Sequence, residues 1–412
     1  MTPLPGISLT DSKDPAYDIV VVGAGPAGLM AAEQAAQTGL RVAIAEKMPS
    51  PARKFLMAGK SGLNITKKEP QAVFLSRFYG KEKLKPILSE FGSTDVIGFA
   101  HKLKQEVFTG STGRVFPTSM KASPLLRSWL KRLDSMGVTL LRNHKWVGPV
   151  ESSNCHLFEA FGKQISISTK ALILAVGGAS WAKLGSDGTW VGQFKEAKIN
   201  LTPFTPSNAG VQVEWSNYMK PHFGSPLKNS ILSAAGIKSR SEFIITSTGI
   251  EGGAVYELGK AMYESQTAQI DLAPQIETAQ LQALFENRNP KDSLSNFLRK
   301  YVKLGAAKRA LVFELNQPIK QNPQDLAKAV KAATMPLLGA QPIDQAISTG
   351  GGVSWDNLTS DLMLTACPGV FCAGEMIDWD APTGGYLITA CMATGWWAGR
   401  ASANYVSANA RL

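Results

Sequence analysis

Three glycines near the start of the chain have the spacing of a phosphate-binding loop. Gly23, Gly25 and Gly28 form a Gly-x-Gly-x-x-Gly pattern directly after the apolar, β-branched run at 17–22. In such loops the first glycine permits a tight turn, the second lets a pyrophosphate approach the backbone, and the third lets a helix pack closely on a sheet. Free N–H groups at the positive end of the following helix then bind the phosphates. The pattern predicts a dinucleotide site.

The residues around this loop supply the elements that must position it. The run at 17–22 is typical of a buried parallel strand, residues 29–37 are rich in helix formers, and residues 41–46 predict a second strand. That second strand ends in Glu46, 23 residues after Gly23, where a carboxylate accepts hydrogen bonds from an adenosine ribose. Together the segments predict a βαβ unit.

The segment after Glu46 favours a loop over another helix and strand. Prolines interrupt residues 48–54, the cations Arg53 and Lys54 follow, and Gly59–Asn64 is a cluster of small and polar residues. Backbone and side-chain donors of this kind suit a polar cofactor that crosses the loop. A plain surface loop explains the same composition equally well.

A second glycine-opened helix start appears near the end of the chain. The apolar run 369–373 leads into Gly374 and Glu375, and Gly384-Gly385 precedes a helical run at 387–398. The cofactor FAD is too long for one βαβ unit, so a late strand with an acid for the ribitol and a second positive helix end suit its length. Donors at that end stabilise the negative charge of a reduced flavin. We therefore expect FAD rather than NAD as the bound dinucleotide.

Residues 169–176 form a further apolar strand, which ends in paired glycines and predicts another close backbone approach. The residues that we expect to bind the cofactor are Gly23, Gly25, Pro26, Ala27, Gly28, Glu46, Lys47, Arg53, Lys54, Gly59, Lys60, Ser61, Asn64, Val147, Gly177, Gly178, Gly374, Glu375, Gly384, Gly385, Tyr386 and Leu387.

No catalytic residue is assigned from the sequence. Lys60, Asp378, Asp380 and Tyr386 flank the expected flavin, but structural roles are the better interpretation: the two aspartates as helix caps and the tyrosine as a packing group. The four histidines are isolated, and the four cysteines have neither a zinc-ligand nor a disulfide pattern, so no metal site is expected.

Charge and hydropathy limit which partners and which cellular compartment we expect. The chain has 43 lysines and arginines against 32 acidic residues, a net charge of +11, yet no block of consecutive like charges. A solvated surface explains this charge better than a nucleic-acid partner does. No apolar run approaches the roughly 20 residues that cross a bilayer. Residues 1–15 predict a disordered leader without the parts of a signal peptide. We expect a cytoplasmic protein.

Five segments are distinctive: GAGPAGLMAAEQAA from Gly23, RKFLMAGKSGLNIT from Arg53, GRVFPTSMKAS from Gly113, GGGVSWDNL from Gly350, and GVFCAGEMIDWDAPTGGYLITACMATG from Gly369. Together they resemble one family of bacterial flavoproteins, the BaiN-like or aminoacetone-oxidase-type FAD-binding proteins. The resemblance covers nearly the whole chain and implies that FAD binds across a domain assembled from both chain ends.

One loop departs from this family. Residues 59–64 read GKSGLN where much of the family has GGGRCN, so no role of that arginine or cysteine is carried over. The expected fold is α/β: a Rossmann-type FAD/NAD(P)-binding domain from residues 1–200 and 345–412, with an inserted domain at 201–344. Within the insertion we expect a β-rich part at 201–275 and a helical part at 276–344, because strand-like runs give way to helical ones.

The leading functional hypothesis is an FAD-dependent oxidoreductase for a small molecule. It would reduce an unsaturated carbonyl compound with electrons from NAD(P)H, which would visit the flavin transiently because no second Gly-x-Gly-x-x-Gly is convincing, or it would oxidise an amine or aminoketone. An RNA-modifying flavoprotein and a non-catalytic flavin-binding regulator are the alternatives. The sequence identifies neither the substrate nor the oligomeric state.

Overall fold

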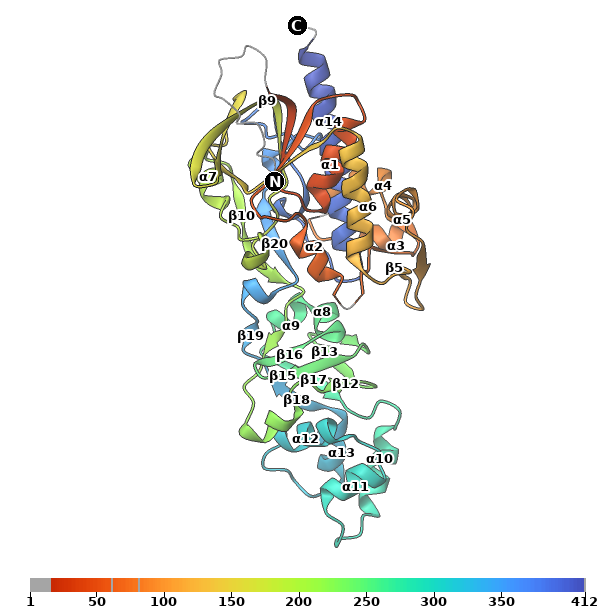
Figure 1. Ribbon diagram of the computed structural model, residues 1–412. Coiled ribbons are helices and arrows are strands. Elements are labelled where there is room, and N and C mark those ends of the chain that lie inside the picture. The colour runs from red at the N-terminus through yellow and green to blue at the C-terminus, as the bar shows by residue number, and fades with distance from the viewer. Residues whose placement is uncertain (1–15, 61, 81, 411–412) are drawn as a thin grey trace. The chain divides into compact units, whose positions relative to one another are not determined.

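The computed structural model describes residues 16–60, 62–80 and 82–410 (Figure 1). The expected leader and the expected cofactor residue Ser61 lie outside the described residues. The chain divides into two compact units. The first contains Met1–Thr205 and Thr349–Leu412, and the second contains Pro206–Ser348. From the sequence we expect these borders after residues 200 and 344.

A parallel sheet forms the centre of the first unit. Strands β6 (Thr139–Arg142), β2 (Val42–Glu46), β1 (Tyr17–Val22) and β9 (Lys163–Leu174) follow one another in that order, and β21 (Val370–Cys372) also pairs with β9. Every residue of β2 and β21 is buried, as expected for parallel strands covered on both faces. The expected Rossmann-type α/β fold is confirmed, with strands from both chain ends in one sheet.

Strand β9 also belongs to an antiparallel meander. Its first half pairs antiparallel with β8 (Cys155–Ala160), which pairs with β7 (His144–Gly148), whereas its second half, from Thr169, pairs parallel with β1. One long strand therefore joins the meander to the parallel sheet, and it ends at Leu174, shortly before the glycine pair Gly177-Gly178.

Three helices lie side by side against this sheet: α1 (Pro26–Ala36), α6 (Ala122–Ser135) and α14 (Tyr386–Asn409) (Figure 1). The last is 24 residues long, beyond the predicted span of 387–398. Helix α14 crosses α1 at Gly395, where an added Cβ atom would stand 2.1 Å from the Ala27 carbonyl oxygen. Only a glycine permits so close a crossing.

A buried ion pair joins α6 to α1. Glu33 of α1 accepts a hydrogen bond from Trp129 Nε1 at 2.8 Å, and it forms an ion pair with Arg132 at 2.8 Å. Burial raises the pKa of Glu33, and Arg132 and Trp129 oppose that shift. The carboxylate thus holds two partners on α6.

Removing this carboxylate should destabilise the first unit. We expect Glu33→Ala to lower the free energy of unfolding by about 2–3 kcal/mol, because it leaves the buried indole N–H unpaired. Glu33→Gln keeps an acceptor for Trp129 and should cost less. Urea denaturation followed by tryptophan fluorescence compares the variants, and equal stability of Glu33→Ala and the unmodified protein would contradict this role.

His156 of β8 is a second buried polar group, and it makes stability depend on pH. Burial lowers its pKa from 6.5 to about 4, while a backbone hydrogen bond at Ser153 opposes the shift. The folded state therefore favours the neutral ring, and the unfolded chain binds a proton first as the pH falls below about 6.5. We expect a loss of about 3 kcal/mol between pH 6.5 and 4 from this group alone.

The pH dependence of unfolding in His156→Gln, compared with the unmodified protein, isolates that contribution. Parallel stability curves for the two proteins between pH 6.5 and 4 would show that the ring does not titrate as its burial requires.

The remaining elements of the first unit position the loops around the sheet. Residues 53–58 form a short helix, so the expectation of a continuous loop after Glu46 is wrong there; their apolar Phe55 is buried and docks the helix. The elements are α2 (Arg53–Ala58), β3 (Thr66–Lys67), α3 (Gln71–Ser76), α4 (Leu84–Glu90), α5 (Ser93–Lys102), β4 (Val107–Thr109), β5 (Arg114–Pro117) and α7 (Val191–Glu196).

Strands β10 (Leu201–Ser207) and β20 (Ser348–Val353) form a two-stranded sheet where the chain passes between the units. The second unit has its own apolar core and two antiparallel sheets, ordered β12-β15-β16-β11-β19 and β14-β13-β17-β18. Its strands are β11 (Val211–Gln212), β12 (Pro226–Leu227), β13 (Ile231–Ala234), β14 (Ile237–Ser239), β15 (Phe243–Thr246), β16 (Gly249–Glu251), β17 (Thr267–Asp271), β18 (Ala333–Pro336) and β19 (Gly339–Ala340).

The helices of the second unit are α8 (Gly253–Leu258), α9 (Lys260–Tyr263), α10 (Thr278–Glu286), α11 (Leu294–Lys300), α12 (Ala306–Glu314) and α13 (Pro323–Lys331). Strands β18 and β19 come from the part that we expected to be helical, and they complete sheets begun by the earlier part. The two parts therefore share one core. Among the residues described in both units, every helix is too short or too polar to cross a membrane.

Candidate functional site

The glycine loop has a different geometry at each of its three glycines. Gly23 has a φ of +99°, and a Cβ atom there would stand 2.3 Å from the Ala175 carbonyl oxygen. A Cβ at Gly28 would stand 1.9 Å from the Gly23 carbonyl oxygen, so this glycine lets α1 pack on the loop. Gly25 faces open space, with no atom within 4 Å of an added Cβ. The turn and the packing are therefore set by Gly23 and Gly28, and the opening lies at Gly25.

Helix α1 begins at this opening. Gly25 is its N-cap residue, Pro26 follows, and no side chain caps the helix. The first N–H groups of a helix have no partner within the helix, and proline at the first position removes a donor that would be unpaired anyway. Ala24 and Ala27 are buried, so the loop packs firmly against the rest of the unit, and the first N–H groups of α1 are the donors that remain for a ligand.

Glu46 fixes the shape of the loop. Its two carboxylate oxygens accept hydrogen bonds from the backbone N–H groups of Ala24 at 2.9 Å and Met48 at 2.8 Å. Burial raises its pKa, and the two backbone donors oppose that shift. Each oxygen has a second lone pair, so the carboxylate can hold the loop and still accept a hydroxyl. Beside it, Lys47 forms an ion pair with Asp187 at 2.8 Å.

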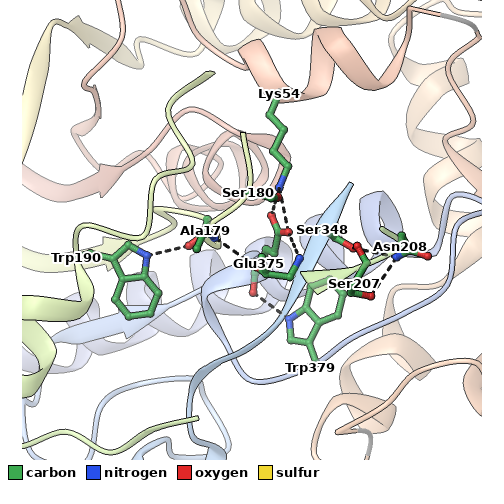
Figure 2. A network of polar contacts seen from close by, with 12 residues as sticks. Lys54, Ala179, Ser180, Trp190, Ser207, Asn208, Ser348, Glu375 and Trp379 are labelled. Atoms are coloured by element: carbon green, nitrogen blue, oxygen red, sulfur yellow. Dashed lines mark hydrogen bonds and ion pairs between the residues drawn. The ribbon is translucent and has the colours of Figure 1, made fainter. Parts of the chain in front are cut away.

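A polar network ties the two chain ends together (Figure 2). Lys54 Nζ donates to Glu375 at 2.7 Å and to Ser180 Oγ at 2.8 Å. The Thr349 N–H donates to the other side of the Glu375 carboxylate at 3.0 Å. Gly178 belongs to this network, because an added Cβ would stand 2.0 Å from Thr349 Oγ1. The paired glycines thus make the predicted close approach, and they make it to protein atoms.

The C-terminal segment brings its own glycines to the same region. A Cβ at Gly374 would stand 2.8 Å from Ala27 Cβ, so the end of β21 contacts the first turn of α1. Gly385, with a φ of +90°, is the N-cap of α14, and an added Cβ would stand 2.5 Å from the Thr66 backbone. From Gly385 to the crossing at Gly395 is about 15 Å along the helix axis. Both glycine-opened helix starts therefore belong to one compact region.

Tyr386, the first residue of α14, is buried in an aromatic cluster. Its ring packs on Phe74 at 5.0 Å and on Phe78 at 5.7 Å between centroids, and its hydroxyl donates to Glu69 at 2.5 Å. Burial, and then the Glu69 carboxylate, raise the pKa of this phenol. The side chain therefore anchors the start of α14 and keeps its proton.

The two candidate aspartates do not cap α14. Asp378 accepts a hydrogen bond from Thr202 Oγ1 at 2.6 Å, and the Asp380 backbone pairs with Tyr79. The cap position belongs to Gly385, so the expectation that these aspartates cap the helix is wrong. The cysteine nearest the network is Cys391, whose pKa is raised to about 12 by burial first and by Glu375 second, so it is a poor nucleophile at neutral pH.

Within the described part of the chain, four buried side-chain atoms have no hydrogen-bond partner. Arg309 Nε belongs to the second unit, and the other three belong to the first: Asn64 Oδ1, Ser186 Oγ and Trp146 Nε1. Ser186 Oγ lies 3.1 Å from the position of an added Cβ at Gly177. Buried polar atoms are nearly always paired, so the unpaired Ser186 Oγ beside Gly177 fits a polar ligand. Asn64 was expected from the sequence. Ser186 and Trp146 were missed, because neither stands in a motif.

The other expected residues surround the loop in different ways. A Cβ at Gly59 would stand 2.7 Å from Ala122 Cβ, so this glycine serves packing against α6. Lys60 is exposed, and Arg53 is half-buried at the start of α2. Val147 is half-buried beside Trp146 in β7, and Leu387 is half-buried in the first turn of α14.

A parallel sheet with this loop, joined by a glycine-opened helix from the other chain end, is the fold used by Rossmann-type FAD-dependent oxidoreductases. The chain belongs to the family described as the HI0933-like protein Rossmann domain, whose model matches residues 17–401.

Two bacterial relatives align over two thirds or more of this chain. The chain is 23% identical over 378 residues to the ribosomal RNA dihydrouridine synthase of Escherichia coli, covering 88% of this chain and 92% of the relative. It is 25% identical over 292 residues to the Haemophilus influenzae protein of the same name, covering 68% of this chain and 70% of that relative.

Two solved structures share the fold. An open-conformation flavocytochrome c3 fumarate reductase aligns with a TM-score of 0.53 and 16% identity, over 95% of this chain and 79% of that one. The 3-ketosteroid-Δ4-(5α)-dehydrogenase from Rhodococcus jostii RHA1 aligns with a TM-score of 0.54 and 14% identity, over 97% of this chain and 99% of that one. At these identities the likeness concerns the fold.

Proposed function

We propose that this chain is an FAD-dependent oxidoreductase that reduces a carbon–carbon double bond conjugated to a carbonyl group. The observation that carries the proposal is the open position beside Gly25, at an uncapped helix start, within the same region as a second glycine-opened helix start. Neither the backbone conformation nor a neighbouring atom requires a glycine at position 25, so a ligand that occupies this space accounts for the missing side chain.

The residues present fit FAD. The N–H groups that follow Gly25 would hold the pyrophosphate, and Glu46 would accept the adenosine ribose. The unpaired atoms of Asn64 and Ser186 would bond polar groups of the cofactor. The start of α14 would face the flavin, where its N–H groups favour negative charge.

When bound, a flavin supplies hydride transfer. The chain itself contributes orientation and electrostatics. The Lys54–Glu375 pair is only partly exposed, at 25% and 12% for the two side chains, so it keeps a fixed charge distribution beside the loop. Tyr386 keeps α14 in place through its aromatic cluster, and its phenol holds its proton at neutral pH.

A second candidate concerns the substrate: the double bond belongs to a uridine of RNA. The uracil ring contains a carbon–carbon double bond conjugated to a carbonyl, and dihydrouridine is the product of its reduction. The two relatives named ribosomal RNA dihydrouridine synthase favour this candidate, and the one from Escherichia coli aligns over most of both chains. The first candidate substrate is a small-molecule enone. It goes with the narrower assignment of this chain to the BaiN-like proteins.

Anaerobic reduction of the FAD-loaded protein tests the proposal. We expect NADH or NADPH to bleach the flavin absorbance, and an added conjugated enone or a uridine-containing RNA to restore it under anaerobic conditions. Mass spectrometry of the acceptor then distinguishes the candidates by which of them has gained two hydrogens. If an aminoketone reduced the flavin instead, and only oxygen reoxidised it, the result would favour oxidation of an amine or aminoketone. A bound flavin that no donor reduces would overturn the proposal and favour a regulatory protein.

A further inference from the structure

A small antiparallel sheet beside the start of α14 has one buried and one open face. Strands β3, β5 and β4 pair in that order, with Thr66 opposite Val115. Both of these residues are fully buried. Side chains alternate between the faces of a strand, so the neighbours of Val115 in β5 point to the opposite face. In Figure 1, β5 lies beside α3 and α5 at the edge of the first unit.

The open face carries an aromatic pair. Phe108 of β4 is directly opposite Phe116 of β5, and their rings stack with centroids 5.7 Å apart and an interplanar angle of 25°. Phe108 is 44% exposed, which is unusual for a phenylalanine in a strand, and Phe116 is half-buried. The methyl group of the exposed Met120 and the Phe116 ring both face Gly62, at 2.7 and 3.9 Å from the position of an added Cβ there.

A pair of cations stands next to the aromatic pair on that face. Arg114 lies two residues before Phe116 in β5, and Lys67 of β3 is directly opposite Arg114. Like charges in directly opposed positions destabilise a sheet. Glu69 compensates Lys67 at 3.3 Å, whereas no carboxylate of the described residues lies within ion-pair distance of Arg114. A bound anion would remove this repulsion.

The cationic end of the face adjoins the second helix start. Arg114 Nε lies 4.0 Å from the position of an added Cβ at Gly384, and Lys67 Nζ lies 5.7 Å from the centroid of the Tyr386 ring. The aromatic pair is one step farther along the strands, about 7 Å away. Cations and then stacked rings therefore extend outward from the region where the flavin is proposed to lie.

The segment of the chain that contains this sheet has a net positive charge. Residues 41–145 contain 20 lysines and arginines but 7 acidic residues, a net charge of +13, whereas the rest of the chain sums to −2. The sheet lies within this basic segment. A polyanion is thus the partner that the electrostatics favour.

From this arrangement we infer that the open face of β3, β5 and β4 binds unpaired nucleotides of an RNA. A base stacks on Phe108 and Phe116, and Arg114 and Lys67 bind the adjoining phosphates, so that the neighbouring nucleotide reaches the start of α14. Exposed aromatic pairs on a sheet face are a common means of binding single-stranded RNA, because every base presents a face for stacking. The inference rests on the proposed function, and on its RNA candidate in particular.

Binding of a fluorescein-labelled oligouridine of about ten nucleotides, a length within the footprint of known single-strand sites, tests the inference. At low salt we expect Phe108→Ala to weaken binding at least fivefold, the lower bound for loss of one stacked base. Phe161→Ala is the matched control, because Phe161 is 77% exposed in a turn far along the sequence from this sheet. Phe108→Leu retains apolar bulk without an aromatic ring and should also weaken binding. The FAD content of each variant is measured in the same preparation.

The outcomes separate the two claims. Equal affinity of Phe108→Ala and Phe161→Ala, or absence of oligouridine binding at low salt with FAD bound and reducible, overturns the RNA face while the proposed redox function stands. Failure of the unmodified protein to bind FAD overturns the proposed function, whatever the RNA affinity. Ultraviolet cross-linking of the unmodified protein to oligouridine provides a second measurement. We expect the cross-link in the peptide 107–117, and a cross-link confined to other segments contradicts the inference.

Discussion

The variant Gly25→Val is expected to fold normally and to contain no flavin. A Cβ at Gly25 meets no atom within 4 Å, and the residue has a φ of −80°, which any amino acid adopts. The substitution therefore leaves the protein's own contacts intact and fills only the space that the pyrophosphate is proposed to use. Absorbance between 350 and 500 nm, roughly the region where flavins absorb, divided by protein concentration, measures the loss.

Two matched variants make this result specific. Gly192→Val, in the exposed helix α7, also meets no atom within 4 Å and should retain the full flavin content. Gly28→Val should instead prevent folding, because its Cβ would lie 1.9 Å from a backbone oxygen. A folded Gly25→Val protein with the flavin content of the unmodified chain would refute the phosphate assignment.

The variant Gly395→Leu is expected to lose the folded first unit. At this position an added Cβ would stand 2.1 Å from the Ala27 carbonyl oxygen, and at Gly399, one turn later, an added Cβ would stand 2.4 Å from the Ala31 carbonyl oxygen. These atoms belong to the backbone of α1 and cannot rotate away. We expect the free energy of unfolding to fall by more than about 3 kcal/mol, the upper range for overpacked cores, with most of the protein insoluble.

Asn404→Leu is the control for that variant, since Asn404 is an exposed position of the same helix. It should unfold at nearly the same denaturant concentration as the unmodified protein. If Gly395→Leu were equally stable, α14 would not cross α1 at the glycine, and the two helix starts would not be held in one region.

Local patterns predicted the elements around the first glycine loop because those elements are determined by neighbouring residues. The run at 17–22, the three glycines and the terminal acid Glu46 occur where the structure has β1, the loop, α1 and the end of β2. The short helix α2 was missed because prolines precede it and a glycine ends it, and its stability comes from burial of Phe55 against the core. Tertiary contacts of this kind leave no local signal.

The candidate site was predictable where a motif carries it and unpredictable where distant residues meet. Lys54 and Glu375 were both expected near the cofactor, but their ion pair joins residues 321 positions apart and follows from no spacing rule. Ser186 was missed for the same reason: it reaches Gly177 through a turn whose residues have no distinctive composition. The roles of Gly59 and Gly178 also needed the structure, since each glycine accommodates a protein neighbour.

The central claim is that one FAD molecule lies across two helix starts contributed by opposite chain ends. A crystal structure of the protein reconstituted with FAD tests it most directly. We expect the pyrophosphate at the backbone of Gly25 and the flavin ring beside Gly384 and Gly385. Well-ordered protein grown with excess FAD that shows the cofactor elsewhere, or shows no bound cofactor at either helix start, would contradict the claim.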